Sequence, residues 1–400
     1  MSSKIYIAGL GIISAIGNNV AECMASLEKE QAGMNNITYL KTIHAGEIPV
    51  AEVRFSNAQL AERSGLPPKL SRTALLSFIA AREALQDAAI GDNNTLRTGF
   101  ISANTVGGID KTENYFSALF ENNTEGDLHD VLYHECGSIT ELVANKLNIN
   151  SYTTTISTAC SSSANSIMLA ARMIRAGMLD VAVAGGVDAL TKFTLNGFNT
   201  LMILDNAYCR PFDEDRNGLN LGEGAGYVTL VSEEVAQSLK KDLYCELKGY
   251  ANANDAYHQT ASSPDGKGSY LAMQDALDEA NLKTENISYI NLHGTGTNNN
   301  DLAEGTAIER LFKPHYPKMS STKSFTGHTL GASGGVEAVF SSLSVWHGII
   351  YPNLRLHTPI KEFPFAAEKN FLKNQQIQNV LSNSFGFGGN CTSLIFSKIV

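Results

Sequence analysis

Short apolar runs alternate with longer segments of helical periodicity along most of the chain. Short runs rich in β-branched residues are typical of buried strands, and apolar residues three and four positions apart are typical of amphipathic helices. Their alternation predicts an α/β fold with parallel strand pairing and buried sheets. We expect strands over residues 5–9, 99–103, 153–157, 181–184, 287–292 and 379–384, and helices over residues 20–30, 71–89, 164–176, 271–280 and 335–346.

Two stretches lack this regularity, residues 121–130 and residues 200–224. A change of composition near residues 239–242 indicates a seam between two halves of the chain. With 400 residues, the chain is long enough for one very large core or for two ordinary ones.

Composition and charge exclude several classes of protein. With 43% hydrophobic and 18% charged residues, the chain is too apolar to be disordered. A formal net charge of −10 disfavours nucleic acid as a partner, and the lack of an apolar run of about 18 residues predicts no membrane span. The six cysteines form no C-x-x-C pair and are too few for a disulfide framework. Reduced thiols in a cytoplasmic protein are the simplest interpretation.

The apolar segment 5–16 has the length of a signal-peptide core, but Gly9 and Gly11 interrupt it and no small-residue cleavage site follows. The order of strand, Gly-x-Gly and helix also resembles a dinucleotide-binding turn. That fingerprint requires Gly or Ala where this chain has Ser14. We therefore expect a sharp turn between a strand and a helix at this point.

Cys160 lies where an expected strand meets a helix rich in small residues. Unpaired N–H groups and the helix dipole at a helix N-terminus favour the thiolate, which is the reactive form of cysteine. A backbone N–H at the same bend can also bind an oxyanion. A nucleophile is one interpretation of Cys160, and an ordinary buried cysteine is the other.

Two histidines are surrounded by glycines, His293 in the motif HGTGT and His328 in the motif GHTLG. Glycine lets the backbone and a ligand approach each other closely. A core histidine with satisfied hydrogen bonds is the alternative for each of them. The pair lacks a cysteine or carboxylate at ligand spacing, so we expect no metal site.

A last glycine-rich run, Phe385-Gly-Phe387-Gly-Gly-Asn390, stands between two strand-like segments. Such a run suits a gate or an oxyanion-binding backbone, and it equally suits a hairpin turn with inward-packed Phe side chains. The spacing of Cys160 and His293 also fits a papain-like protease, but the residues around Cys160 lack the sequence of those proteases.

Together these segments resemble the beta-ketoacyl-acyl-carrier-protein synthases of the elongating type, which are condensing enzymes of the thiolase superfamily. The resemblance extends nearly from end to end of the chain, and the order of the motifs is highly specific. The matching segments are residues 5–17, Arg210-Pro-Phe-Asp213, Gly222-Glu-Gly-Ala-Gly226, Asp255-Ala-Tyr-His258, both histidine motifs and residues 384–390.

The resemblance implies a five-layered α-β-α-β-α sandwich of two similar halves, which we expect over residues 1–242 and 243–400. It implies an acyltransferase that carries out a decarboxylative Claisen condensation of an acyl group with malonyl-acyl-carrier protein, in fatty acid or type II polyketide or polyene synthesis. The products are a beta-ketoacyl-carrier protein, CO2 and free carrier protein. The only cofactor implied is the phosphopantetheine arm of the carrier protein. A homodimer is expected, and a heterodimer with a chain-length-factor-like subunit is the alternative.

Carried over residue by residue, the resemblance makes Cys160 the nucleophile that takes the acyl chain as a thioester. His293 and His328 would donate hydrogen bonds to the carbonyl of the malonyl thioester. Lys323 would support the second of these histidines and the electrostatics of the site. Backbone N–H groups of Cys160 and Phe387 would form an oxyanion hole, and the ring of Phe387 would act as a gate.

Further residues match supporting positions of the family. Glu337 and Asp301 match acidic residues that organise the interior, and Glu337 would pair with Lys323 because a buried lysine without a partner is costly. Carrier proteins are acidic and so is this chain, so docking requires a local basic patch. The pantetheine arm would bind Thr295 and Thr297, Val106 would narrow the acyl tunnel, and the docking candidates are Lys69, Arg72 and Arg210.

The chain also departs from the family pattern. Asn298 stands where members usually have Pro, and the helix after Cys160 begins with an unusually polar sequence. Cys391 invites comparison with thiolases, which use a second cysteine as a base, but theirs precedes a glycine run and Cys391 follows one. Two alternatives therefore stay open, a thiolase and a non-catalytic partner subunit of the chain-length-factor kind, which typically lacks the cysteine.

Overall fold

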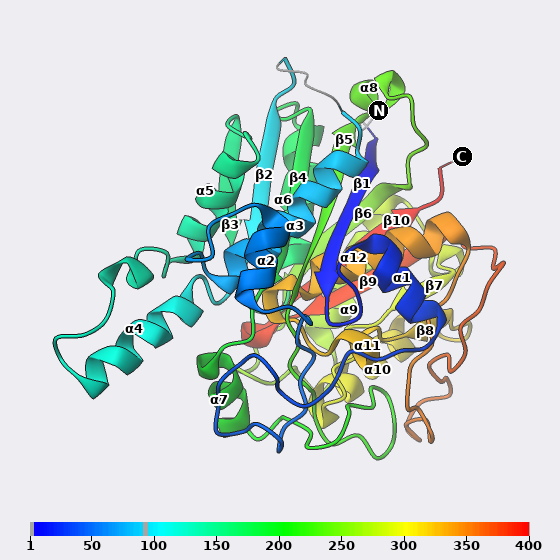
Figure 1. Cartoon of the computed structure of the whole chain (residues 1–400). Coiled ribbons are helices and arrows are strands. Elements are labelled where there is room, and N and C mark those ends of the chain that lie inside the picture. The colour runs from blue at the N-terminus through cyan, green and yellow to red at the C-terminus, as the bar shows by residue number, and fades with distance from the viewer. Residues whose placement is uncertain (1–3, 91–94, 400) are drawn as a thin grey trace.

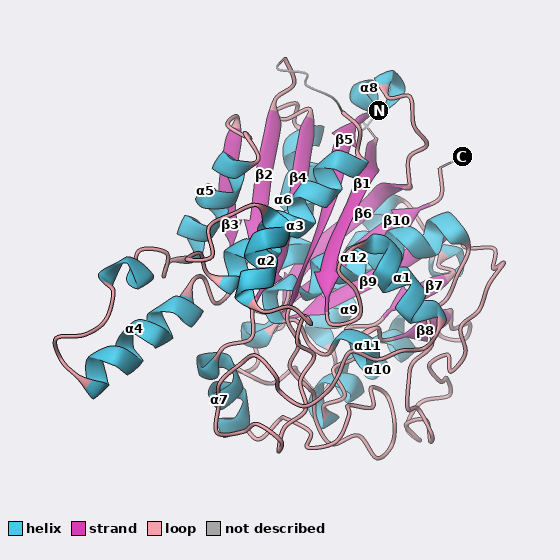
Figure 2. Ribbon diagram, viewed as in Figure 1, coloured by secondary structure: helices cyan, strands magenta, loops and turns pink. Residues whose placement is uncertain are grey.

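The computed structural model describes residues 4–90 and 95–399, and helices and strands alternate along most of this length (Figures 1 and 2). The strands are β1 (Ile5–Ser14), β2 (Thr98–Ala103), β3 (Tyr152–Ile156), β4 (Val181–Asp188), β5 (Gly224–Ser232), β6 (Cys245–Asn254), β7 (Tyr289–Asn291), β8 (Lys318–Ser320), β9 (Asn379–Phe385) and β10 (Asn390–Ser397). The α-helices are α1 (Val20–Glu28), α2 (Asn57–Ser64), α3 (Arg72–Asp87), α4 (Ile109–Glu121), α5 (Cys136–Lys146), α6 (Ser162–Arg175), α7 (Lys192–Thr200), α8 (Glu233–Ser238), α9 (Lys267–Ala280), α10 (Asn298–Phe312), α11 (Lys323–Thr326) and α12 (Ser333–His347).

The strands form two five-stranded parts with the same topology. Within the described ranges, the order across the sheet is β3-β2-β4-β5-β1 followed by β6-β10-β9-β7-β8. The two parts meet where β1 pairs with β6 over a very short stretch. Along the chain, the first half runs β1, α3, β2, α5, β3, α6, β4, β5, and the second half runs β6, α9, β7, α10, β8, α12, β9, β10. Each strand of the first half therefore has a counterpart in the second, as do the helices α3, α5 and α6.

Helices cover both outer faces and fill the space between the two parts of the sheet (Figure 1). Helices α3 and α5 pack on the outside of the N-terminal part, and α9 and α10 pack on the outside of the C-terminal part. Helices α6 and α12 contact strands of both parts. The residues of α12 from Ser333 to Val345 are buried on every side, as expected for a helix between two sheets. These layers confirm the α-β-α-β-α sandwich.

The pairing of the strands is mixed. Strand β2 pairs in parallel with β3 and β4, and β7 pairs in parallel with β8 and β9. The remaining pairs, which involve β1, β5, β6 and β10, are antiparallel. The expectation of parallel pairing therefore holds for the outer strands of each half, where helices connect successive strands, and fails for the strands at the centre.

The turn predicted at Gly9 and Gly11 is wrong, because both residues lie inside β1, which continues to Ser14. A Cβ atom on Gly9 would lie 2.1 Å from the backbone oxygen of Ala84, and one on Gly11 would lie 2.0 Å from that of Ala80. Both oxygens belong to α3. Glycine is required here because the helix backbone packs directly on the strand.

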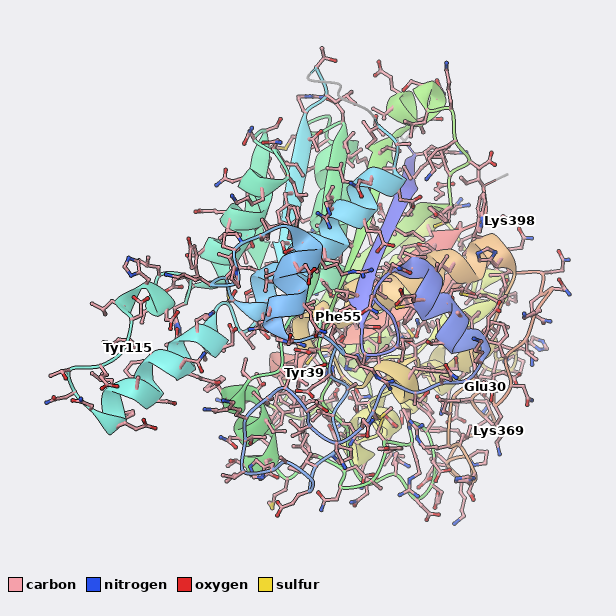
Figure 3. The ribbon with its side chains drawn as sticks, viewed as in Figure 1. Glu30, Tyr39, Phe55, Tyr115, Lys369 and Lys398 are labelled. Atoms are coloured by element: carbon pink, nitrogen blue, oxygen red, sulfur yellow. The ribbon has the colours of Figure 1, made fainter. Side chains whose placement is uncertain are left out.

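The other predicted helices and strands are present, with ends that differ by a few residues. Residues 201–223, predicted to be irregular, contain no helix or strand. In the part of the chain that the structure describes, no helix is both long enough and apolar enough to span a membrane. Helix α4 projects from the body of the molecule, and the labelled Tyr115 lies on this projection (Figure 3).

Candidate active site

A cavity of about 360 Å³ brings together three side chains that are far apart in the sequence: Cys160, His293 and His328 all line it. Cys160 precedes α6, His293 follows β7, and His328 lies between α11 and α12. All three residues are buried. Cys160 and His293 each follow the carboxyl end of a strand that pairs in parallel with its neighbour, which is the usual location of ligand sites in α/β folds.

A strained turn places Cys160 at the start of α6. Ala159 has a positive φ of 51°, which is uncommon for a residue with a side chain. The hydroxyl of Ser162 fastens the turn, since it accepts a hydrogen bond from the N–H of Thr158 at 2.7 Å and donates one to the carbonyl of Ala159. The sulfur therefore faces the cavity from the N-terminus of a buried helix.

Burial dominates the protonation of Cys160. Removal of the thiol from water raises its pKa to about 12, whereas Lys323 and the backbone N–H groups of Phe387 and Cys160 itself lower it. These groups favour the thiolate, but burial outweighs them and the resting thiol is neutral. These two N–H groups, for which the resemblance implied an oxyanion hole, therefore lie beside the sulfur.

The two histidine rings lie close together and nearly perpendicular, with centroids 5.4 Å apart and an interplanar angle of 86°. Nδ1 of His328 accepts a hydrogen bond from the N–H of Leu330 at 3.2 Å and lies 3.0 Å from the hydroxyl of Ser333. Nδ1 of His293 lies 3.3 Å from Nζ of Lys323, and a lysine ammonium is only a donor. Both Nδ1 atoms are therefore acceptors, so each neutral ring carries its proton on Nε2.

Both imidazoles are held neutral. Burial lowers the pKa of His293 and of His328 well below the usual value, and the positive charge of Lys323 acts in the same direction. Two neutral rings with protonated Nε2 atoms can stabilise a negative oxygen in the cavity.

Lys323 is buried and forms an ion pair with Glu337, as we predicted. Burial raises the pKa of Glu337 to about 7, and the lysine acts against this shift. The ammonium group of Lys323 contacts His293 and not His328. The expectation that Lys323 supports the second histidine is therefore wrong for a direct hydrogen bond. Lys323 affects His328 only through its charge.

Two carboxylates on α10 fix the turn that carries His293. Asp301 accepts hydrogen bonds from the N–H groups of Thr295, at 3.0 Å, and Gly296, at 3.2 Å. Glu304 accepts from the N–H of His293, at 2.9 Å, and from that of Gly294, at 2.8 Å. The sequence analysis missed Glu304, although its position one helical turn after Asp301 places both carboxylates on one face of the helix.

The structure places the other predicted residues at different distances from the cavity. Thr295 and Thr297 line it, and their hydroxyl oxygens are 2.9 Å apart. The ring of Phe387 stacks on Phe198, a residue of α7 that the sequence analysis missed, with centroids 5.7 Å apart. Val106 is buried outside the lining of this cavity, and its N–H donates to a carboxylate oxygen of Asp188 at 3.2 Å.

The prediction that Arg72 helps to dock an acidic partner is wrong. Arg72 is buried, and its guanidinium binds both carboxylate oxygens of Glu223, with Nη2 at 2.6 Å from Oε1 and Nε at 2.8 Å from Oε2. Lys69 is exposed and Arg210 is half-buried. Cys391 is also buried and lies outside the lining of the cavity, so it does not take the place of a second catalytic cysteine.

A family model described as the N-terminal domain of beta-ketoacyl synthase matches residues 2–236, and one described as the C-terminal domain matches residues 244–357. The chain belongs to the beta-ketoacyl synthase family. It is 33% identical to the 3-oxoacyl-[acyl-carrier-protein] synthase 2 of Staphylococcus aureus (strain N315) and to that of Vibrio harveyi, over 99% of each chain.

Solved structures of ketosynthases are similar over the whole length of the chain. One is described as the ishigamide ketosynthase/chain length factor, with 28% identity, a TM-score of 0.93 and full coverage of both chains. Another is a ketosynthase (ApeO) in complex with its chain length factor (ApeC) from Xenorhabdus doucetiae, with 30% identity, a TM-score of 0.85 and coverage of 99% and 98%. This beta-ketoacyl synthase is therefore an acyltransferase, a condensing enzyme of fatty acid or type II polyketide synthesis, and not a thiolase.

Proposed function

We propose that this enzyme joins an acyl group carried on Cys160 to malonyl-acyl-carrier protein, with loss of CO2. The observation that carries the proposal is that Cys160, His293 and His328 line the same cavity. A thiol that can hold an acyl group and two donors that can hold an enolate are the two components that this reaction needs.

The first half-reaction transfers the acyl group. The sulfur of Cys160 attacks the thioester carbonyl of an acyl-carrier protein, and the N–H groups of Cys160 and Phe387 bind the resulting oxyanion. The bond from the carbonyl carbon to the pantetheine sulfur then breaks. The neutral thiol of Cys160 gives up its proton during this step, and the departing pantetheine sulfur ends with a proton as a free thiol. The acyl group is left on Cys160 as a new thioester.

The second half-reaction forms the carbon–carbon bond. His293 and His328 donate their Nε2 protons as hydrogen bonds to the thioester oxygen of malonyl-carrier protein, which stabilises the enolate formed as CO2 leaves. The enolate carbon attacks the acyl group on Cys160, and the sulfur leaves and regains a proton. The product is a beta-ketoacyl-carrier protein that is two carbons longer than the acyl group. Lys323 and Glu337 hold the ring of His293 in place.

We further propose that the phosphopantetheine arm reaches the cavity past Thr295 and Thr297, whose hydroxyls line it. The carrier protein would dock near Lys69, which is exposed, and Arg210, which is half-buried. The halves would divide near residue 242, with residues 1–242 carrying Cys160 and residues 243–400 carrying both histidines.

The first test is a Cys160→Ala variant. Incubation with an acyl-carrier protein should give an enzyme adduct that carries the mass of the acyl group in the parent and none in the variant, and condensation with malonyl-carrier protein should be abolished. Intact-mass spectrometry measures the adduct. An adduct that persists in the variant would place the nucleophile elsewhere.

A further inference from the structure

The side chain of Asn390 ties the glycine-rich loop of residues 386–390 to the helix that carries the nucleophile. Its Oδ1 atom accepts three hydrogen bonds: from the hydroxyl of Ser161 at 2.7 Å, from Nδ2 of Asn165 at 2.9 Å and from Nδ2 of Asn252 at 2.8 Å. Ser161 and Asn165 belong to the start of α6, and Asn252 belongs to β6. One oxygen thus joins the loop to two other elements.

The backbone of Asn390 also holds the residue that precedes Phe387, whose N–H belongs to the proposed oxyanion hole. The carbonyl of Asn390 accepts a hydrogen bond from the N–H of Gly386 at 2.8 Å. Gly386 packs against the nucleophile turn so closely that a Cβ atom would lie 3.0 Å from the carbonyl oxygen of Thr158 and 3.1 Å from the nitrogen of Cys160. The next residue is Phe387, whose N–H lies beside the sulfur.

The loop backbone alone does not fix this geometry. Gly388 and Gly389 have φ angles of 80° and 78°, and glycine at such angles has unusual conformational freedom. The loop tip also contacts the exposed carbonyl of Gln259, the exposed side chain of Asn254 and the N–H of Asp255, and the ring of Phe387 stacks on Phe198. The partly buried hydrogen bonds of Asn390 are the ones that face the nucleophile helix.

We propose that Asn390, held by Asn165 and Asn252, is a positioning residue that keeps the N–H of Phe387 aimed at the carbonyl oxygen of the incoming acyl thioester. This inference rests on the proposed function, in which Cys160 is acylated and Phe387 contributes to the oxyanion hole. The polar residues Ser161 and Asn165 at the start of α6 then have a specific role, because they donate hydrogen bonds to Asn390 at the end of the loop of residues 386–390.

The test separates acyl transfer from general reactivity of the thiol. In Asn390→Leu, single-turnover acylation of Cys160 by hexanoyl-carrier protein should fall by about 10–100-fold, the effect of a small misplacement of a catalytic group. Alkylation of Cys160 by iodoacetamide needs no oxyanion hole, so its rate should persist. Asn390→Asp should restore most of the acylation rate, because a carboxylate oxygen accepts the same three hydrogen bonds.

Asn252→Ala provides a second variant that is expected to fold, since Asn252 is exposed. It removes one of the three donors and should lower acylation in the same direction by a smaller factor. Parental acylation in folded Asn390→Leu and Asn252→Ala, equal losses of acylation and alkylation, or no rescue by Asp would each overturn the positioning role. An acyl adduct on Cys160→Ala would instead overturn the proposed function, so the two failures are distinguishable.

Discussion

At Cys160, removal of the thiol from water raises its pKa to about 12, although Lys323 and two backbone N–H groups act in the opposite direction. The same burial lowers the pKa of His293 and His328. The resting cavity therefore holds a neutral thiol and two neutral imidazoles. This state suits the proposed reaction, because an imidazolium would pair with the malonyl carboxylate and oppose its loss as CO2.

The two histidines should act in only one of the half-reactions. His293→Ala or His328→Ala should slow CO2 release from malonyl-carrier protein by about 10²–10³-fold, the usual effect of removing one oxyanion donor. Acylation of Cys160 should persist in part, since it uses backbone N–H groups. Release of labelled CO2 and the mass of the acyl-enzyme measure the two steps separately. Unchanged CO2 release in both variants would contradict the assignment.

Single residues also show why the charge of one basic side chain does not predict where that side chain lies or what it contacts. The charge of Arg72 predicts a surface residue, but Glu223, which lies 151 positions away in the sequence, pairs with it inside the protein. The resemblance implied that Lys323 supports His328, whereas its hydrogen-bond contact is with His293. Both errors concern contacts between distant segments, which a local pattern does not contain.

At the scale of elements, periodicity predicted most helices and strands of the two sheets, because those elements bury one face or both. It missed elements that have little local signal. Strand β8 is only three residues long, and α4 has few buried residues. The two glycines of β1 suggested a turn because the α3 backbone that they accommodate comes from another part of the chain.

The contact between β1 and α3 gives a prediction about stability. Gly11→Ala should lower the free energy of unfolding by about 1–3 kcal/mol, the usual cost of overpacking a core, because the new methyl group would collide with the carbonyl of Ala80. Gly137→Ala is the matched control: it lies in α5, nothing lies within 4 Å of its added Cβ atom, and it should stabilise by about 0.4–1 kcal/mol. Denaturant unfolding measures both. Equal stabilities of the two variants would contradict this packing.

At the scale of the whole molecule, two features of the N-terminal half suit association with another chain. Strand β3 ends the sheet and is only partly buried along its length. Helix α4 and the segment that follows it also project from the body and expose apolar side chains: Phe120 has 85% of its surface exposed, Leu128 has 69% and Leu132 has 63%. Clustered exposed apolar groups are typical of interfaces.

We therefore expect the purified chain to be a homodimer, with Phe120→Asp shifting it towards monomer. Ile43→Asp is a suitable control, because Ile43 is 87% exposed but does not belong to the projection, and it should leave the dimer intact. Light scattering after size-exclusion chromatography measures the mass. A monomeric parent would contradict the homodimer and direct attention to the chain-length-factor-like partner.

Local sequence determined the α/β class, most elements of the two sheets and the motifs around Cys160, His293, His328 and Phe387. These properties follow from hydrophobic periodicity and from residue types that are adjacent in the chain. The tertiary structure decided what depends on distance and on exclusion of water. Burial sets the neutral state of the thiol and of both imidazoles. Folding also brings together Lys323 and His293, Glu304 and the turn of His293, Arg72 and Glu223, and Asn390 and the start of α6. Each of these needs groups that meet only after folding, because electrostatic and hydrogen-bond energies depend on separation and burial rather than on position along the chain.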